Sequence, residues 1–118
     1  MKDISDTLKY KGKDYKLVFN FNVLEETQAV YGTLTKWVEE AYGKKTGEPS
    51  AKALTFMLTL MINEGIDIEN EDREEKVKPL TLKQVGRLLS EIDLNTAVST
   101  IDELMGKSIK GGENSKNE

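Results

Sequence analysis

The chain has 118 residues, of which 37% are hydrophobic and 32% are charged, as expected for one globular domain with well-solvated surfaces. It contains no cysteine and no histidine, which excludes disulfides, thiol chemistry, the usual zinc ligands and histidine-based catalysis. The net charge of -4 argues against a general nucleic-acid or anionic-membrane binder, and no window is apolar enough to span a bilayer.

Two strands followed directly by a helix are predicted near the N-terminus. We expect the strands over Asp6–Tyr10 and Asp14–Phe21, joined by a tight connection in which Gly12 takes a positive φ. Apolar and polar side chains alternate along the second strand, which is typical of a strand with one buried face. Asn22 is then expected to cap a helix that ends at Gly32.

Further helices are predicted, each introduced by a side chain that can accept a hydrogen bond from a free amide of the first helical turn. They are expected to begin after Thr33, Ser50 and Thr81, and at Asp93 or Asn95. The helix after Ser50 is expected to end at Gly65. A charged, solvated segment over Ile66–Lys78 would follow it.

These elements predict an α+β fold, mostly α, with an N-terminal β-hairpin packed on a compact bundle of about five helices. Because an isolated hairpin is only marginally stable, its apolar face must lie on the helices or add to a sheet in a neighbouring subunit. Residues 1–107 are expected to form a single globular domain. Residues 108–118 are expected to be a disordered polar tail.

The helix after Ser50 is unusually apolar, because its apolar side chains cover an arc of roughly 240°, more than one packing face requires. Such a helix is either central to the bundle or partly covered by another protein. A chain this short offers few places to bury every large apolar side chain, and large exposed patches usually mark partner surfaces. The candidate partner-binding residues are Trp37, Tyr42, Phe56, Met57, Leu60 and Met61.

Three motifs that could carry chemistry fail on their spacing. An EF-hand loop starting at Asp67 would need glycine and glutamate where Asp72 and Lys78 stand. The glycines and lysines of residues 43–47 follow a helix, whereas a phosphate-binding loop follows a strand. Nothing indicates that the paired carboxylates, such as Glu39 and its neighbour, are buried, as a catalytic carboxylate generally requires. We therefore expect no catalytic residue, no cofactor and no metal site.

Residues 12–22, GKDYKLVFNFN, followed by Leu24-Glu25-Glu26 and Tyr31-Gly32, resemble the opening of tail assembly chaperones from long-tailed phages of Gram-positive bacteria. The matching pattern is G-K-x-Y-x-L-x-F-N-F-N-x-L, then acidic helix residues, then glycine. It covers about the first third of the chain; beyond Tyr42 only the helical character and the length agree. The motif contains no chemical group in a catalytic arrangement, so it points to a fold rather than to a reaction.

The resemblance implies a non-enzymatic protein that binds the phage tape-measure protein, and in some cases the tail tube protein, before the tail polymerises. It also implies a place in the host bacterial cytoplasm and absence from the mature virion, and the acidic charge and the lack of an apolar span predict no nucleic-acid or membrane partner. From the hairpin edge and the apolar helix we also expect some tendency to form homo-oligomers. The alternative is another phage structural or regulatory interaction protein without enzymatic activity.

Overall fold

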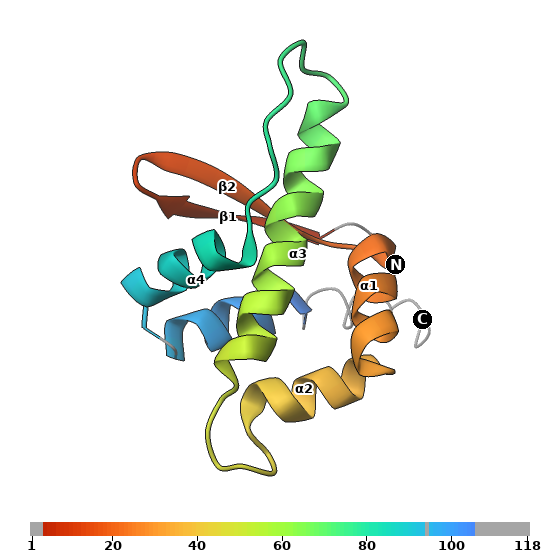
Figure 1. Cartoon of the computed structure of the whole chain (residues 1–118), viewed down its shortest axis with the longest axis vertical. Coiled ribbons are helices and arrows are strands. Elements are labelled where there is room, and N and C mark those ends of the chain that lie inside the picture. Colours follow the sequence, from red (N-terminus) through yellow and green to blue (C-terminus); the bar gives the residue numbers. More distant parts are fainter. Residues whose placement is uncertain (1–3, 94, 106–118) are drawn as a thin grey trace, which may run out of the picture.

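The computed structural model describes residues 4–93 and 95–105 of the chain (Figure 1). The elements are β1 (Ile4–Tyr10), β2 (Lys13–Phe19), α1 (Phe21–Tyr31), α2 (Leu34–Tyr42), α3 (Ala51–Asn70), α4 (Leu82–Glu91) and a further helix over residues 95–105. An antiparallel hairpin followed by five helices in a compact molecule confirms the predicted fold class. The predicted tail over residues 108–118 lies outside the described residues.

The hairpin is closed by a two-residue turn. Lys11 and Gly12 both have positive φ, 51° and 75°, as the mirror-image turns that match the twist of paired strands require. Leu8 stands opposite Tyr15 in the register, and burial increases along β2 until Leu17, Val18 and Phe19 are all buried. The hairpin packs on α3 of its own chain, so it needs no neighbouring subunit to cover its apolar face.

The junction between β2 and α1 lies two residues earlier than predicted. Asn20, not Asn22, caps α1, and its side-chain oxygen accepts a hydrogen bond from the Val23 amide at 3.3 Å. The side-chain amide of Asn20 donates to Oε2 of Glu64 in α3 at 2.7 Å, which orients the oxygen toward the helix. Either asparagine suits a cap locally, and both donate to Glu64, so the choice follows from the end of β2 at Phe19, directly before Asn20. As a result Phe21 is the first helical residue, and it is 59% exposed rather than buried.

The predicted caps of the other helices are confirmed. Thr33, Ser50 and Thr81 each accept a hydrogen bond from the amide three residues later, and Thr81 forms a full capping box with Gln84. Asp93 caps the helix over residues 95–105, since its carboxylate accepts from the backbone amide and hydroxyl of Thr96 at 2.8 and 3.1 Å. These hydrogen bonds lower the pKa of Asp93.

Helix α3 is the central element, and it is longer than predicted. Gly65 does not end it but lies in its interior, where a Cβ atom would be only 2.3 Å from the backbone carbonyl oxygen of Lys16 in β2. Glycine is needed here because helix and strand cross at close range. The helix therefore continues to Asn70, and Ile66, which was expected in a solvated loop, is buried.

The charged segment that follows α3, residues 71–80, is here called the return segment. It projects beyond the bundle and runs back along α3 (Figure 1). Two asparagines of α3 each bond to both backbone groups of one residue in it. Asn70 binds Val77 through two bonds of 2.9 Å, and Asn63 binds Leu80 through bonds of 3.0 and 2.8 Å. The predicted solvated segment, Ile66–Lys78, is mostly exposed from residue 71 on, whereas residues 66–70 belong to α3 and the prediction is wrong for them.

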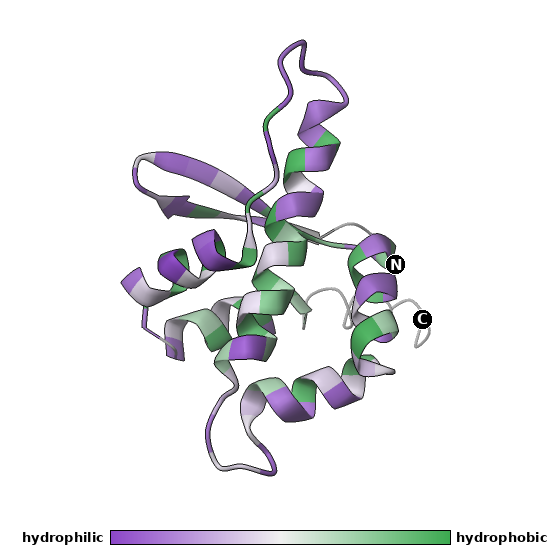
Figure 2. Ribbon diagram, viewed as in Figure 1, coloured by the Kyte–Doolittle hydropathy of each residue, from purple (hydrophilic) through white to green (hydrophobic). Residues whose placement is uncertain are grey.

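One apolar core joins the hairpin to the helices. The ribbon carries the hydrophobic colour along much of the middle and lower part of α3 (Figure 2). Trp37 of α2 is fully buried in this core, and its indole N–H donates to the carbonyl of Ala53 at 2.9 Å. Residues 95–105 close the core with Ile101 and Leu104. None of the described helices is both long enough and apolar enough to cross a membrane.

Candidate functional site

Three of the candidate partner-binding residues belong to the interior. Trp37, Met57 and Met61 have no exposed surface, so they cannot touch a partner while the chain keeps this fold, and the prediction is corrected for them. The reason is that α3 contacts β2, α1, α2 and α4, which together absorb most of its wide apolar arc. The helix is apolar because it is central, which was one of the two interpretations open from the sequence.

The other three candidates are half-buried. The hydroxyl of Tyr42 donates a hydrogen bond to Asp102 and so ties α2 to the helix over residues 95–105. Burial, together with this hydrogen bond, raises the pKa of Tyr42 above its ordinary value. Phe56 packs edge to face against Tyr31, with ring centroids 5.2 Å apart. Leu60 lines a surface hollow, and it is the candidate residue best placed to meet a partner.

That hollow lies between α1 and α3 and has a volume of about 370 Å³. We call it the α1–α3 groove. Its lining residues are Asn22, Val23, Glu25, Glu26, Leu60, Asn63, Glu64 and Asp67. None of these residues is basic, so the groove carries charge of one sign only. Clustered like charges with apolar walls favour an oppositely charged occupant.

One carboxylate of the groove is held in place by two amide donors. Oε2 of Glu64 accepts hydrogen bonds from the side chains of Asn20 and Asn22, at 2.7 and 2.9 Å. Both asparagines come from the strand-to-helix corner, so the residues that start α1 also fix the acidic end of the groove. The motif Asn20-Phe21-Asn22 of the sequence thus has a structural role beyond capping.

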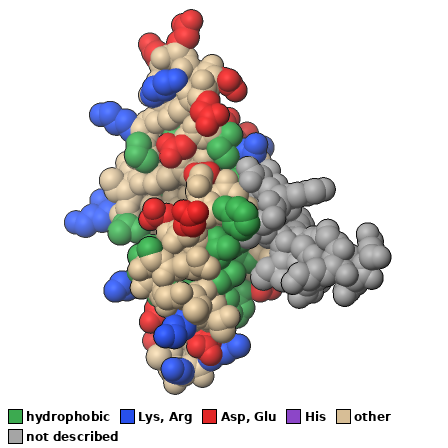
Figure 3. Space-filling model, turned by 90° about the vertical axis from the view of Figure 1, so that its right-hand side faces the viewer, with side chains coloured by type: hydrophobic (Ala, Val, Ile, Leu, Met, Phe, Trp, Pro, Cys, Tyr) green, Lys and Arg blue, Asp and Glu red, His purple; other side chains and the backbone are tan. Residues whose placement is uncertain are grey.

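Two exposed apolar side chains lie on α1, the helix that forms one side of the groove. Val30 is 62% exposed, and it lies one helical turn after Glu26 and two turns after Val23, both of which line the groove. Phe21, one turn before Glu25, is 59% exposed. Figure 3 shows apolar side chains among acidic ones on this face of the molecule. The sequence pattern did not single out α1, because its buried stripe is narrow and its apolar residues point to several sides.

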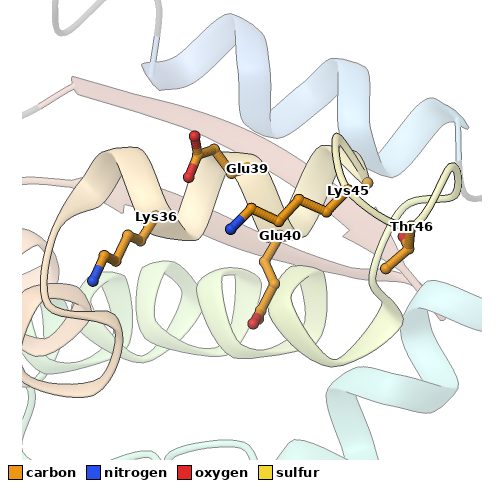
Figure 4. A pocket seen from close by; sticks show the side chains of 6 residues that line it. Lys36, Glu39, Glu40, Lys45 and Thr46 are labelled. Atoms are coloured by element: carbon orange, nitrogen blue, oxygen red, sulfur yellow. The ribbon is translucent and has the colours of Figure 1, made fainter.

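The hollow at the end of α2 is unsuited to phosphate. It contains Lys36, Glu39, Glu40, Lys45 and Thr46, and the side chain of Lys45 extends back over α2 near both glutamates (Figure 4). Three amides of this loop, those of residues 43, 44 and 47, already donate to backbone carbonyls. The loop also lies at the C-terminal, negative end of a helix dipole, which repels anions.

A larger hollow, of about 500 Å³, lies between the hairpin and the return segment. Basic and acidic side chains both line it, including Lys16, Glu69 and Arg73. Its charge therefore favours neither an acidic nor a basic occupant. Arg73 and Glu69 form the only ion pair among the described residues, at 3.6 Å. In the same residues no group of three or more potential ligands is placed to hold a metal ion.

The chain matches no protein-family model, no curated protein sequence and no solved structure. The resemblance of residues 12–32 to tail assembly chaperones stays a prediction. The geometry defines a mostly helical α+β domain whose distinctive surface is an acidic groove with apolar edges.

Proposed function

We propose that this chain is a phage tail assembly chaperone that binds the tape-measure protein and keeps it soluble until the tail polymerises. The proposal rests on the resemblance of residues 12–32 and on the α1–α3 groove, where four carboxylates line one hollow of a helix pair whose α1 exposes two large apolar side chains. The groove is the observation that carries it, because carboxylates beside apolar side chains suit an amphipathic basic segment of another chain.

The physical need for such a protein is plain. A tape-measure protein is a long helical chain whose apolar stripes stay exposed until the tail tube encloses them, and exposed stripes aggregate. A small acidic domain with an apolar-edged groove covers such a stripe by helix-in-groove recognition. The tail tube protein is a second candidate client. The proposed site of action is the host cytoplasm, with the chaperone absent from the finished virion.

The test is co-expression with the tape-measure protein encoded in the same genome. We expect that protein to be insoluble alone, and soluble and co-eluting in the presence of the chain. The tail tube protein is tested in parallel, with an unrelated helical protein as the control. If the tape-measure protein stays equally insoluble, or co-elutes no better than the control, the proposal is wrong.

A structural component of the virion is the competing function. Quantitative mass spectrometry of washed, mature particles separates the two. A chaperone is released before the tail is complete, so we expect this chain to be far below one copy per tail subunit. Finding it in fixed stoichiometry with tail proteins would favour the structural alternative.

A further inference from the structure

We infer that the α1–α3 groove binds a helical segment that is apolar at one end and carries lysine or arginine about two turns further along. The identification of this segment as part of the tape-measure protein rests on the proposed function. The chemistry of the segment does not, because it follows from the groove itself.

The groove has two chemically different ends. Helices α1 and α3 run antiparallel, since Asn22 at the start of α1 donates to Glu64, whereas Tyr31 at its end packs on Phe56. Carboxylates gather at the first end, around Glu64 and Asp67. Toward the other end the half-buried Leu60 lines the hollow, and Phe56, one turn earlier on α3, packs on Tyr31 in the C-terminal turn of α1, which also exposes Val30.

The charge of the groove selects a basic occupant. The carboxylates of Glu25, Glu26, Glu64 and Asp67 all line one hollow, and none has an ion-pair partner among the described residues. Bringing like charges together is unfavourable, and a cationic side chain placed among them relieves the repulsion. An acidic peptide would add to the repulsion, and a wholly polar one would leave the apolar end uncovered.

The spacing along α3 sets the length of the occupant. Phe56, Leu60, Glu64 and Asp67 follow one another at intervals of four, four and three residues, so they lie on one face of the helix. From Phe56 to Asp67 the rise is about 16 Å, or roughly three turns. A helix laid along this row therefore needs two apolar side chains one turn apart. Its basic side chains must fall in the next two turns.

The first measurement uses the full chain and a synthetic helical peptide with that pattern, two leucines one turn apart followed by two lysines. We expect its addition to shift backbone amide NMR signals of Glu26, Leu60 and Asp67 progressively. A matched peptide with glutamate in place of both lysines should produce no shifts at the same concentration. Shifts that instead map to the hollow between hairpin and return segment would overturn the inference.

The second measurement compares two variants of equal net charge. Glu26→Lys combined with Asp67→Lys should weaken binding of the lysine peptide about tenfold or more, because two attractive contacts become repulsive. Glu74→Lys combined with Glu75→Lys changes two exposed carboxylates of the return segment and should leave the affinity within about twofold. Equal weakening by both variants would mean that only overall charge matters, and the inference would fail.

Two further comparisons keep the result interpretable. A neutral variant, Glu26→Gln with Asp67→Asn, covers the case in which the lysine variant unfolds, and it should weaken binding to an intermediate degree. If the variant with Glu26→Lys and Asp67→Lys retains the tape-measure protein at wild-type level, the inference is wrong and the proposed function is unaffected. If the peptide binds in the groove but the wild-type chain does not retain the tape-measure protein, the inference holds and the proposed function is wrong.

Discussion

Gly65 shows how a single residue can position a whole hairpin. It lies inside α3 at the point where the helix crosses β2, and the backbone carbonyl of Lys16 occupies the space that a side chain would need. A backbone carbonyl cannot move aside as a flexible side chain does. The contact therefore tolerates only a residue without a Cβ atom, and it fixes the distance between the hairpin and the central helix.

Gly65→Ala should destabilise the fold by about 1–3 kcal/mol, because overpacking forces the backbone of helix or strand to shift. Gly86→Ala is the matched control. Gly86 also lies inside a helix, α4, but nothing is within 4 Å of the position of its Cβ atom. Alanine there should stabilise by up to about 1 kcal/mol. Urea denaturation of the two variants measures this, and changes of the same sign would contradict the assigned crossing.

Tyr42 gives the molecule an alkaline sensitivity. Burial and the hydrogen bond to Asp102 raise the pKa of Tyr42 in the folded state, so above about pH 10 the unfolded chain has lost a proton that the folded chain keeps. The folded state then binds more protons than the unfolded state, and the free energy of unfolding falls as pH rises.

Tyr42→Phe should cost about 1 kcal/mol near neutral pH, where the hydroxyl donates its hydrogen bond. Between about pH 9 and 11 the melting temperature of the variant should fall less steeply than that of the wild type. Melting curves across that range measure the difference. Tyr31, whose pKa is also raised by burial, is present in both proteins and does not contribute to it. Parallel pH profiles would refute the linkage to Tyr42.

At the scale of helices and strands, features that depend only on neighbouring residues could be predicted from the sequence. The caps at Thr33, Ser50 and Thr81 were predicted correctly, because a cap depends on residues within one turn of it. The end of β2 at Phe19, which makes Asn20 the cap, and the passage of α3 through Gly65 depend on how strand and helix pack on each other. This packing cannot be inferred from the residues next to Asn20 or Gly65 in the sequence.

The site was harder to predict than the fold, for a related reason. Apolar side chains such as Met57 and Met61 occur both in cores and on partner surfaces. Here they are buried because other elements pack around α3. The groove depends on which side of α1 faces α3, and the helix pattern leaves that open. Of the candidates, Leu60 lines the groove and Phe56 packs at its apolar end.

Asn63 and Asn70 anchor the return segment through their side-chain amides. Replacing the amide nitrogen by oxygen, as in asparagine to aspartate, should weaken each anchor. Asn63→Asp replaces the amide donor to the Leu80 carbonyl by an oxygen, so two acceptors would face each other, at a cost of about 1–3 kcal/mol. Asn70→Asp makes the same change at the more exposed Val77 contact and should cost less. Urea denaturation of the two variants measures the costs, and a larger cost for Asn70→Asp than for Asn63→Asp would contradict the assignment.

At the scale of the whole molecule, the chain buries more of its apolar residues than its length suggested. Among the described residues the large apolar side chains left well exposed are Phe21, Val30, Val77 and Leu82. Two of these lie on α1 beside the groove, and the other two lie on the return segment and α4. The expected homo-oligomer stays a prediction, to be tested by light scattering over a range of concentrations.

Val30→Ser and Leu82→Ser form a matched pair, because the two side chains are 62% and 57% exposed. Each should change the free energy of unfolding by no more than about 0.5 kcal/mol, as is usual at the surface. If the apolar edge of the groove covers a client, only Val30→Ser should reduce the amount of tape-measure protein kept in solution. Equal solubility with both variants would place the client elsewhere.

The asparagine anchors of the return segment have one more consequence, which concerns ionic strength. They are neutral groups, so raising the salt concentration from 0.1 to 1 M, which shortens the Debye length from about 10 to about 3 Å, should leave them intact. Attraction between the carboxylates of the groove and a cationic helix should be largely screened under the same conditions. A bound cationic helix should then be eluted by salt while the domain itself stays folded.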